Sequence, residues 1–264
     1  RKLPWREDRD PYHVWLSEIM LQQTRVEAVK GYYQRFLTAL PDIKALAEAP
    51  EDLLMKLWEG LGYYSRVRNL QKAARVIMTE YDGVFPSDYK AMLSLPGIGE
   101  YTAGAIGSVC FDLPEPAVDG NVLRIISRIT ENYNNILSPV MKKEITQILR
   151  NIYPSGELAY LFNQSMMELG ATVCVPNGAP KCDICPVQQI CMAYVNHTWE
   201  LLPQKEAKKK RKIEYKTVFV LQSGGKTAIE KRSAKGLLAG LWQYPNVEGT
   251  LDVQAALDIA ASWQ

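Results

Sequence analysis

Four of the five cysteines lie close together near residue 180. They are Cys174, Cys182, Cys185 and Cys191, with seven, two and five residues between them. Thiolates bind zinc or iron–sulfur clusters, and the short loop-like segments between these four would let them converge on one centre. A single Cys-x-x-Cys pair, where four-cysteine zinc folds usually have two, favours a cluster over zinc. Disulfides are a third interpretation, although nothing else in the sequence indicates secretion.

Two carboxyl groups lie in contrasting sequence environments. Glu18 lies within an apolar helical run, where burial would raise its pKa and favour the protonated form. Asp119 directly precedes a second apolar helix, whose free N–H groups and dipole favour a charged carboxylate. One neutral and one charged carboxyl is a pattern that can cleave a glycosidic bond. The alternatives are an ordinary helix cap for Asp119 and an arginine partner for Glu18.

Other segments have the composition of a nucleic-acid contact. The turn at residues 95–99, Leu-Pro-Gly-Ile-Gly, joins two predicted helices and would expose the first N–H groups of the second helix to a phosphate. Tyr63 lies shortly before Arg66, and Trp5 precedes Arg6. Exposed aromatic rings beside arginine can stack on bases and pair with phosphates. The alternatives are a simple helix–helix turn and aromatic residues that belong to the core.

These residues need elements that position them. Residues 11–200 are predicted to be mostly helical, because apolar residues recur at helical spacing between Gly and Pro breaks. The basic stretch within 201–212 has nothing to bury and is predicted to be a linker. From residue 213 the texture changes, and 215–221 followed by a Ser-Gly-Gly turn predicts a β-hairpin. A second domain of another class is therefore expected to begin there.

The composition excludes several classes of protein. The chain has 264 residues, of which 47% are hydrophobic, and a formal net charge of +2. This is typical of a globular protein with a core, which excludes wholesale disorder. No apolar run approaches the roughly 18 residues of a membrane-spanning helix, so a membrane protein is not expected. The net charge does not require a nucleic-acid partner, so that case depends on local patches.

Several motifs in one order resemble a known family. The hairpin LPGIGEYTAGAI, the segment PAVDGNVLRIISR and the cysteine cluster resemble the endonuclease III superfamily of DNA glycosylases. WREDRDPYHVWLSEIMLQQTRV and WEGLGYYSRVRNL are similar to its adenine DNA glycosylase (MutY) branch. The resemblance covers about residues 1–200, and GLLAGLWQYP at 236–245 is similar to the start of a Nudix-like domain.

The resemblance implies a mainly α fold with two helical lobes, followed by the start of an α/β Nudix-like domain. It places an iron–sulfur cluster helical domain at 1–25 and 132–200. A six-helix domain with the helix–hairpin–helix occupies 26–131. The linker at 201–212 then leads to a partial Nudix-like domain at 213–264.

The resemblance also implies a role for each matching residue. Glu18 matches the acid that protonates the adenine ring, and Asp119 matches the catalytic aspartate, which Asn121 supports. Tyr101 lies where bifunctional relatives have a nucleophilic lysine. The residues that match the adenine pocket are Trp5, Arg6, Leu21 and Gln164. The residues that match those contacting the duplex are Gln23, Thr24, Leu61, Tyr63, Gly97 and Gly99. The ligands of a 4Fe–4S cluster are matched by Cys174, Cys182, Cys185 and Cys191.

The implied function is base excision repair by a monofunctional hydrolase that removes adenine mispaired with 8-oxoguanine or guanine. The expected partner is double-stranded DNA, the cofactor a 4Fe–4S cluster, the state a monomer, and the location a bacterial-type cytoplasm near the nucleoid, with no membrane. One alternative is a thymine or uracil mismatch glycosylase on the same scaffold. A bifunctional lyase would need an amine at position 101, where this chain has Tyr101. A non-catalytic iron–sulfur DNA-binding module would leave Glu18 and Asp119 without a role.

Overall fold

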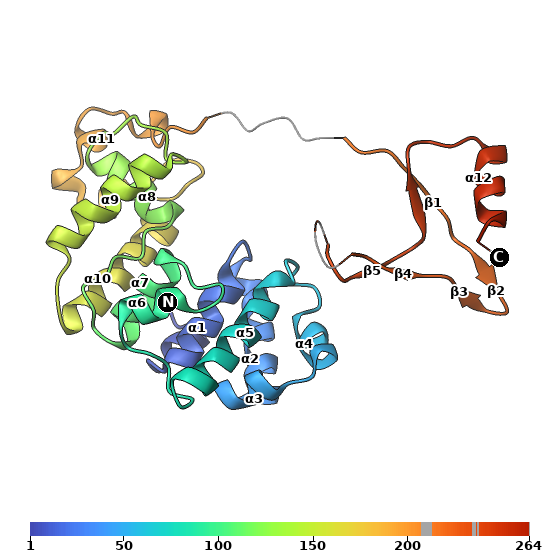
Figure 1. The fold of residues 1–264 in the computed structure, drawn as a ribbon. Helices are drawn as coiled ribbons and strands as arrows, with labels where there is room; N and C mark the ends of the chain where they lie inside the picture. The colour runs from blue at the N-terminus through green and yellow to red at the C-terminus, as the bar shows by residue number, and fades with distance from the viewer. Residues whose placement is uncertain (207–212, 234–235, 237, 264) are drawn as a thin grey trace. The chain divides into compact units, whose positions relative to one another are not determined.

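The computed structural model describes residues 1–206, 213–233, 236 and 238–263. The chain forms two compact units, Arg1–Glu206 and Ala207–Gln264, of which the first is helical and the second contains short strands (Figure 1). The mainly α fold expected from the sequence is confirmed for the first unit. Most of the expected linker lies at 207–212, outside the described residues.

The first half of the helical unit is a group of helices packed around α1 (Pro11–Leu21). Asp10 caps this helix, because its Oδ1 accepts hydrogen bonds from the N–H groups of Tyr12 and His13, and Pro11 occupies the first turn. The remaining elements of this half are η1 (Pro4–Arg6), α2 (Val26–Ala39), α3 (Ile43–Glu48), α4 (Glu51–Trp58), α5 (Ser65–Glu80), α6 (Tyr89–Ser94) and α7 (Glu100–Cys110).

Burial explains why α1 lies at the centre. Trp15, Leu16 and Met20 are almost completely buried, and α1 packs against α2, α5 and α7. Apolar side chains from residues 3–109 form one continuous core around it. A residue on α1 that faces away from this core therefore borders the neighbouring half of the unit.

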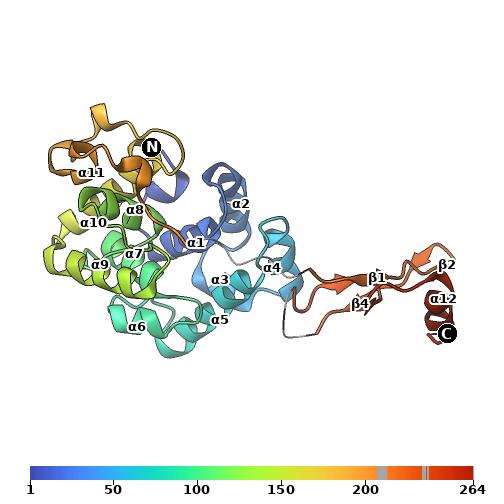
Figure 2. The same ribbon diagram turned by 90° about the horizontal axis from the view of Figure 1, so that it is seen from above.

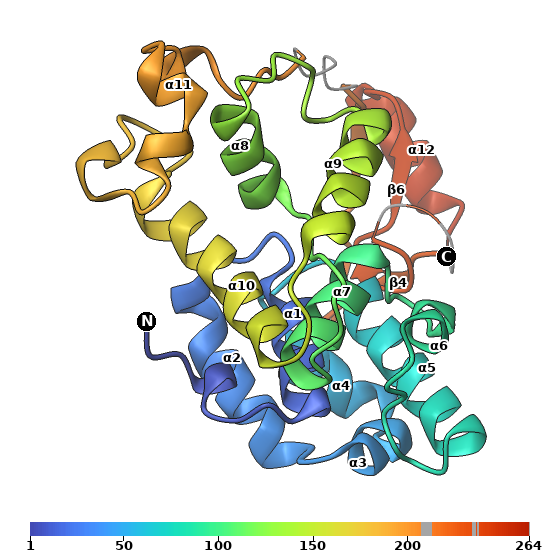
Figure 3. The same ribbon diagram turned by 90° about the vertical axis from the view of Figure 1, so that its left-hand side faces the viewer.

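The second half of the helical unit has its own smaller core. Its elements are α8 (Gly120–Ile129), α9 (Pro139–Ile152), α10 (Glu157–Glu168), η2 (Leu169–Val173), η3 (Cys182–Ile184), η4 (Gln188–Ile190), α11 (Met192–Val195) and η5 (Trp199–Leu201). Val122, Leu123, Ile145 and Leu149 form the centre of this core, between α8 and α9. Figure 2 shows α8–α11 on one side of α1 and α2–α5 on the other. In Figure 3, α10 lies between α8 and α1, where the two halves meet.

The described residues of the second unit include three antiparallel strand pairs. β1 (Lys216–Val218) pairs with β6 (Asn246–Glu248), β2 (Gln222–Ser223) with β3 (Lys226–Thr227), and β4 (Glu230–Lys231) with β5 (Trp242–Gln243); α12 (Val253–Ala261) follows. The predicted turn is confirmed between β2 and β3, where Gly224 and Gly225 both have positive φ. Leu237, within the segment similar to a Nudix-like domain, lies outside the described residues.

Among the described helices, none has the length and hydropathy to cross a bilayer. The division of the helical unit at residues 25/26 and 131/132, and the Nudix-like character of residues 213–264, stay predictions.

Candidate active site

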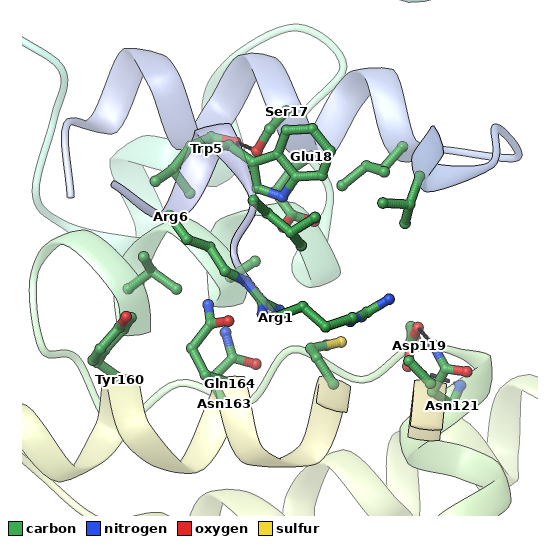
Figure 4. Close-up of a pocket in the computed structure, with 18 of the residues that line it drawn as sticks. Arg1, Trp5, Arg6, Ser17, Glu18, Asp119, Asn121, Tyr160, Asn163 and Gln164 are labelled. Atoms are coloured by element: carbon green, nitrogen blue, oxygen red, sulfur yellow. Dashed lines mark hydrogen bonds between the residues drawn. The ribbon is translucent and has the colours of Figure 1, made fainter. Parts of the chain in front are cut away.

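A pocket of about 250 Å³ lies where the two halves of the helical unit meet. Figure 4 shows Glu18 and Trp5 on the side of α1, Gln164 and Asn163 on α10, and Asp119 at a third corner. The pocket thus brings together residues that are far apart in the sequence, including both carboxyl groups selected by their sequence environments.

Glu18 is half-buried in the pocket wall. Its Oε2 accepts a hydrogen bond of 2.8 Å from the hydroxyl of Tyr101 on α7, and not from an arginine as the alternative expected. Burial raises the pKa of Glu18 to about 7, and the nearby charge of Asp119 acts in the same direction. The Tyr101 hydrogen bond and Arg6 oppose this shift. Glu18 is therefore protonated in a large fraction of molecules at neutral pH.

Tyr101 connects this acid to the hairpin. It lies in the first turn of α7, directly after the Gly-rich turn, and is half-buried where it lines the pocket. Burial and the neighbouring Glu18 raise the pKa of Tyr101 well above its usual value of 10, so its hydroxyl stays protonated and donates. A tyrosine here holds the acid but offers no amine.

Asp119 has the opposite environment at the start of α8. Its Oδ1 accepts hydrogen bonds from the backbone N–H groups of Asn121 (2.8 Å) and Val122 (2.9 Å). Its Oδ2 accepts a third, of 2.7 Å, from the side-chain amide of Asn121. Three N–H donors and the helix N-terminus stabilise a negative charge. The predicted helix cap is confirmed, and it leaves the carboxylate bordering the pocket.

A buried arginine, Arg124, supports Asn121. This arginine was not among the residues predicted from the sequence. Arg124 Nη2 donates to Asn121 Oδ1 (3.0 Å) and to the carbonyl of Gly170 (2.8 Å), and its Nε donates to the carbonyl of Cys174 (2.9 Å). A Cβ at Gly170 would lie 2.7 Å from the Cβ of Asn121, so a glycine permits this close approach. The sequence does contain a feature that could have indicated this role, namely an arginine within the apolar run of α8.

The predicted base-binding residues meet on the remaining walls. Trp5 is buried with its ring edge-on to Tyr33, at a centroid distance of 5.5 Å. Leu21 lines the pocket beside it. Gln164 Oε1 is buried and has no hydrogen-bond partner among the described residues. Gln164 also lines the pocket, so its side chain brings an unsatisfied acceptor to this wall.

Arg6 is held by an acid that the sequence did not single out. Arg6 Nη1 lies 2.8 Å from Glu168 Oε1, and Arg1 Nη2 lies 2.7 Å from the same oxygen. The hydrogen bond from Arg1, followed by that from Arg6, lowers the pKa of Glu168 to about 2 against the effect of burial. Other lining residues absent from the predicted set are Asp8, Ser17, Tyr160, Asn163 and Met167.

Four of the predicted duplex-contacting residues lie in two loops, one after α1 and one after α4. Gln23 is exposed in the loop after α1, and Tyr63, which is 64% exposed, lies in the loop after α4. Thr24 is half-buried and lines the pocket. Leu61 is different, because its side chain is only 7% exposed and packs in the first core. Its contact with a duplex stays a prediction, and in this conformation its side chain is not on the surface.

The Gly-rich turn at residues 95–99 joins α6 to α7, as predicted from the sequence. Gly97 has φ +80°, and a Cβ there would lie 2.8 Å from the Cβ of Asn69, so the position requires glycine. Gly99 is the N-cap residue of α7. Both glycines are exposed, and the first N–H groups of α7 have no carbonyl partner within their own helix. This end of α7 can bind an anion.

The four clustered cysteines border one cavity. Cys174, Cys182, Cys185 and Cys191 line it together, and all four are free thiols, which disagrees with the disulfide alternative. Arg128 Nη1 lies 3.3 Å from Cys174 Sγ. Within the described part of the chain, no three His, Cys, Asp or Glu side chains are grouped closely enough for a single metal ion.

Fold and site together define a helix–hairpin–helix protein with a half-buried acid opposite a capped carboxylate. The sequence profile described as HhH-GPD superfamily base excision DNA repair protein matches residues 16–154. The adenine DNA glycosylase of Buchnera aphidicola subsp. Schizaphis graminum (strain Sg) is 38% identical over 256 residues, covering 94% of this chain and 71% of that protein. The adenine DNA glycosylase of Homo sapiens is 33% identical, covering 94% of this chain and 55% of that protein.

Solved structures have the same fold. A thermostable thymine-DNA glycosylase superposes with a TM-score of 0.66 at 31% identity, covering 74% of this chain and 89% of that one. An endonuclease III–DNA complex gives a TM-score of 0.62 at 23% identity, covering 73% of this chain and 88% of that one. The chain belongs to the HhH-GPD superfamily of base excision DNA repair proteins, and within it to the adenine DNA glycosylase family.

Proposed function

We propose that this chain is a monofunctional DNA glycosylase that hydrolyses the N-glycosidic bond of adenine mispaired with 8-oxoguanine or guanine in duplex DNA. The observation that carries the proposal is the pair of carboxyl groups in one pocket. Glu18 is half-buried with a pKa raised to about 7, and Asp119 is held by three N–H donors. Family membership supports the same activity.

Glu18 is the proposed general acid. An adenine leaves poorly as an anion, so a proton delivered to N7 makes it a neutral leaving group. Glu18 fits this role because its pKa lies near neutrality and its hydrogen bond to Tyr101 fixes the carboxyl group. A general acid whose pKa is near the working pH combines a populated protonated form with an adequate driving force for transfer.

Asp119 is the proposed stabiliser of the sugar. As the base departs, positive charge develops on the deoxyribose, and a fixed carboxylate beside it offsets that charge. The three N–H donors hold Asp119 in place before the substrate arrives, so little reorganisation is needed during the reaction. Water then completes the hydrolysis. Tyr101 cannot form a Schiff base, which agrees with a glycosylase that leaves the strand intact.

The walls of the pocket suit a purine with an exocyclic amino group. Trp5 and Leu21 supply apolar surface against the base. The orphaned Oε1 of Gln164 accepts, and the amino group of adenine donates. Arg6, held by Glu168, adds donors on the same wall. Together, Trp5, Leu21, Gln164 and Arg6 form the proposed adenine-recognition surface.

Double-stranded DNA is the proposed partner, bound by a monomer. The glycosidic bond is inaccessible within a duplex, so the adenine has to be extruded into the pocket. Exposed Tyr63 and Gln23 would occupy the gap and contact the opposite base, with Thr24 and Leu61 beside them. Gly97 and Gly99 would place the end of α7 against a phosphate. A bacterial-type cytoplasm, at the nucleoid, is the proposed location.

A 4Fe–4S cluster is the proposed cofactor of the four cysteines. Four thiolates around one zinc ion at 2.3 Å would lie about 3.8 Å from each other, whereas a polynuclear cluster takes one thiolate per iron and needs wider spacing. The four thiols border one cavity, which supports a centre that all four share. When bound, the cluster would tie together the loops between residues 174 and 191. A broad visible absorption band would support it, and a colourless, zinc-containing protein would contradict it.

A thymine mismatch glycosylase is the second candidate, since a thymine-DNA glycosylase has the same fold at 31% identity. That structure covers 74% of this chain, whereas the Buchnera adenine DNA glycosylase aligns over 94%. A single-turnover assay on duplexes with adenine, thymine or uracil opposite 8-oxoguanine or guanine distinguishes the two. Release of adenine alone supports the proposal, and release of thymine without adenine would contradict it.

A further inference from the structure

A single buried arginine hydrogen-bonds to both loops that the proposed function assigns to the duplex. Arg66 lies in the first turn of α5 and is only 8% exposed. Its Nη1 donates to the carbonyls of Ile19 (2.8 Å), Met20 (3.1 Å) and Gln22 (2.7 Å), at the end of α1. These are carbonyls that a helix leaves without partners within itself.

The other terminal nitrogen of the same guanidinium reaches the second loop. Arg66 Nη2 donates to the carbonyls of Leu61 (2.9 Å) and Gly62 (3.2 Å), and lies 3.5 Å from Thr24 Oγ1 in the first loop. Trp58 Nε1 donates to the same Gly62 carbonyl (3.1 Å). The guanidinium also lies 5.2 Å from the centre of the Trp58 ring and 5.8 Å from that of Tyr63.

Both loops have backbone that needs such support. Gln23 has φ +58° and Tyr63 has φ +48°, in the left-handed region that is unfavourable for residues other than glycine. Each residue directly follows a carbonyl that Arg66 binds, namely that of Gln22 or Gly62. Strained backbone of this kind persists only where its surroundings hold it. Arg66 supplies that hold on both sides at once.

We infer that Arg66 is a positioning residue that fixes the Gln23 loop and the Tyr63 loop relative to each other, so that both enter the duplex as one preformed wedge. The same contacts fix the last turn of α1, which follows Glu18 directly. Arg66 thereby also fixes the position of the two loops relative to Glu18. The Nε of Arg66 has no partner among the described residues, so the guanidinium is oriented by its two terminal nitrogens.

This inference rests on the proposed function, and amide hydrogen exchange tests it without any reaction. Lysine retains the charge at position 66 but has one nitrogen and cannot reach both loops. Arg66→Lys should speed exchange at residues 22–24 and 61–63 together. Arg75→Lys is the matched control, since Arg75 lies on the same helix but donates to Ala47, away from both loops. Faster exchange in only one of the two loops would overturn the inference.

Excision from two duplexes supplies the functional readout. Opposite an abasic site, adenine has no pair to break, so extrusion depends less on the wedge. Arg66→Lys should slow single-turnover excision opposite 8-oxoguanine by on the order of 10–100-fold, and opposite an abasic site by much less. An equal loss on both duplexes, with unchanged loop exchange, would reduce Arg66 to a general structural role. If the parent chain excises adenine from neither duplex, the proposed function fails, while the exchange result still decides the inference.

A milder variant keeps the test open if Arg66→Lys does not fold. Trp58→Phe removes the hydrogen bond to the Gly62 carbonyl together with part of a buried ring, and retains an aromatic ring against the guanidinium. If Arg66 couples the loops, faster exchange at 61–63 should be accompanied by faster exchange at 22–24. Exchange that rises at 61–63 alone would contradict the coupling.

Discussion

The two carboxyl groups of the pocket lie in different environments on its two sides. On the α1 side, desolvation of the half-buried Glu18 raises its pKa to about 7, and the single hydrogen bond from Tyr101 opposes this rise. On the α8 side, Asp119 receives three N–H donors at a helix N-terminus. Desolvation thus prepares Glu18 to deliver a proton near neutral pH, whereas the three N–H donors fix Asp119 in a position where a carboxylate can offset a cation.

The largest effect is expected at the capped carboxylate. Asp119→Asn retains an oxygen for the N–H groups of Asn121 and Val122 but removes the negative charge. Removing one well-placed charge should slow single-turnover excision of adenine by roughly a thousandfold or more. Duplex affinity and thermal unfolding should stay close to those of the parent.

Asp42→Asn is the control for that variant. Asp42 caps α3 by accepting from the N–H of Ala45 (2.7 Å), away from the pocket. Its replacement tests the cost of an amide at a helix cap by itself, and excision should be nearly unchanged. Excision by Asp119→Asn within tenfold of the parent would show that the charge on the α8 side is not needed.

The half-buried acid should produce the next largest effect. Glu18→Gln retains the shape and an acceptor for the Tyr101 hydroxyl, but it cannot donate a carboxyl proton. The rate should fall by on the order of 10²–10⁴-fold, as for other general acids. A purine that leaves readily without protonation should be excised with a much smaller loss. An equal loss for both bases would mean that Glu18 positions the substrate instead of protonating it.

Tyr101→Phe should sharpen the comparison with a smaller effect. The hydroxyl lowers the pKa of Glu18, so its removal should raise that pKa further and extend activity to higher pH. Loss of one orienting hydrogen bond, about 1 kcal/mol, should slow excision by roughly fivefold. Tyr133→Phe, at an exposed tyrosine, is the control. If the fall in excision rate at high pH occurs at the same pH in Tyr101→Phe as in the parent, Tyr101 does not influence the pKa of Glu18.

The sequence predicted local features of this site better than contacts between distant segments. The Asp119 cap involves residues two and three positions away, so its geometry follows from helix formation alone. The Glu18–Tyr101 hydrogen bond joins residues 83 positions apart, and only the packing of α1 against α7 brings it about. The role of Glu168 depends in the same way on Arg1 and Arg6, at the other end of the helical unit.

Two loop residues show that side-chain orientation was also not predictable from the sequence. Leu61 and Tyr63 are neighbours in one Gly-rich segment, yet Leu61 is buried and Tyr63 is exposed. Sequence spacing does not separate them, because the direction of each side chain depends on the positive φ at Tyr63 and on the contacts of Arg66. The loop was predictable as a unit, whereas the orientation of its side chains was not.

The pH dependence of single-turnover adenine excision tests the contrast between the two carboxyl groups most directly. Between the usual value of 4.5 and about 7, folded Glu18 retains a proton that the unfolded chain has released. Folding stability and the protonated acid should therefore both decline as pH rises through this window. We predict a rate that falls as pH rises through about 7, and a Glu18→Gln variant whose low rate has lost this limb. A parent rate that stays level up to pH 9, or a limb that persists in Glu18→Gln, would contradict the account.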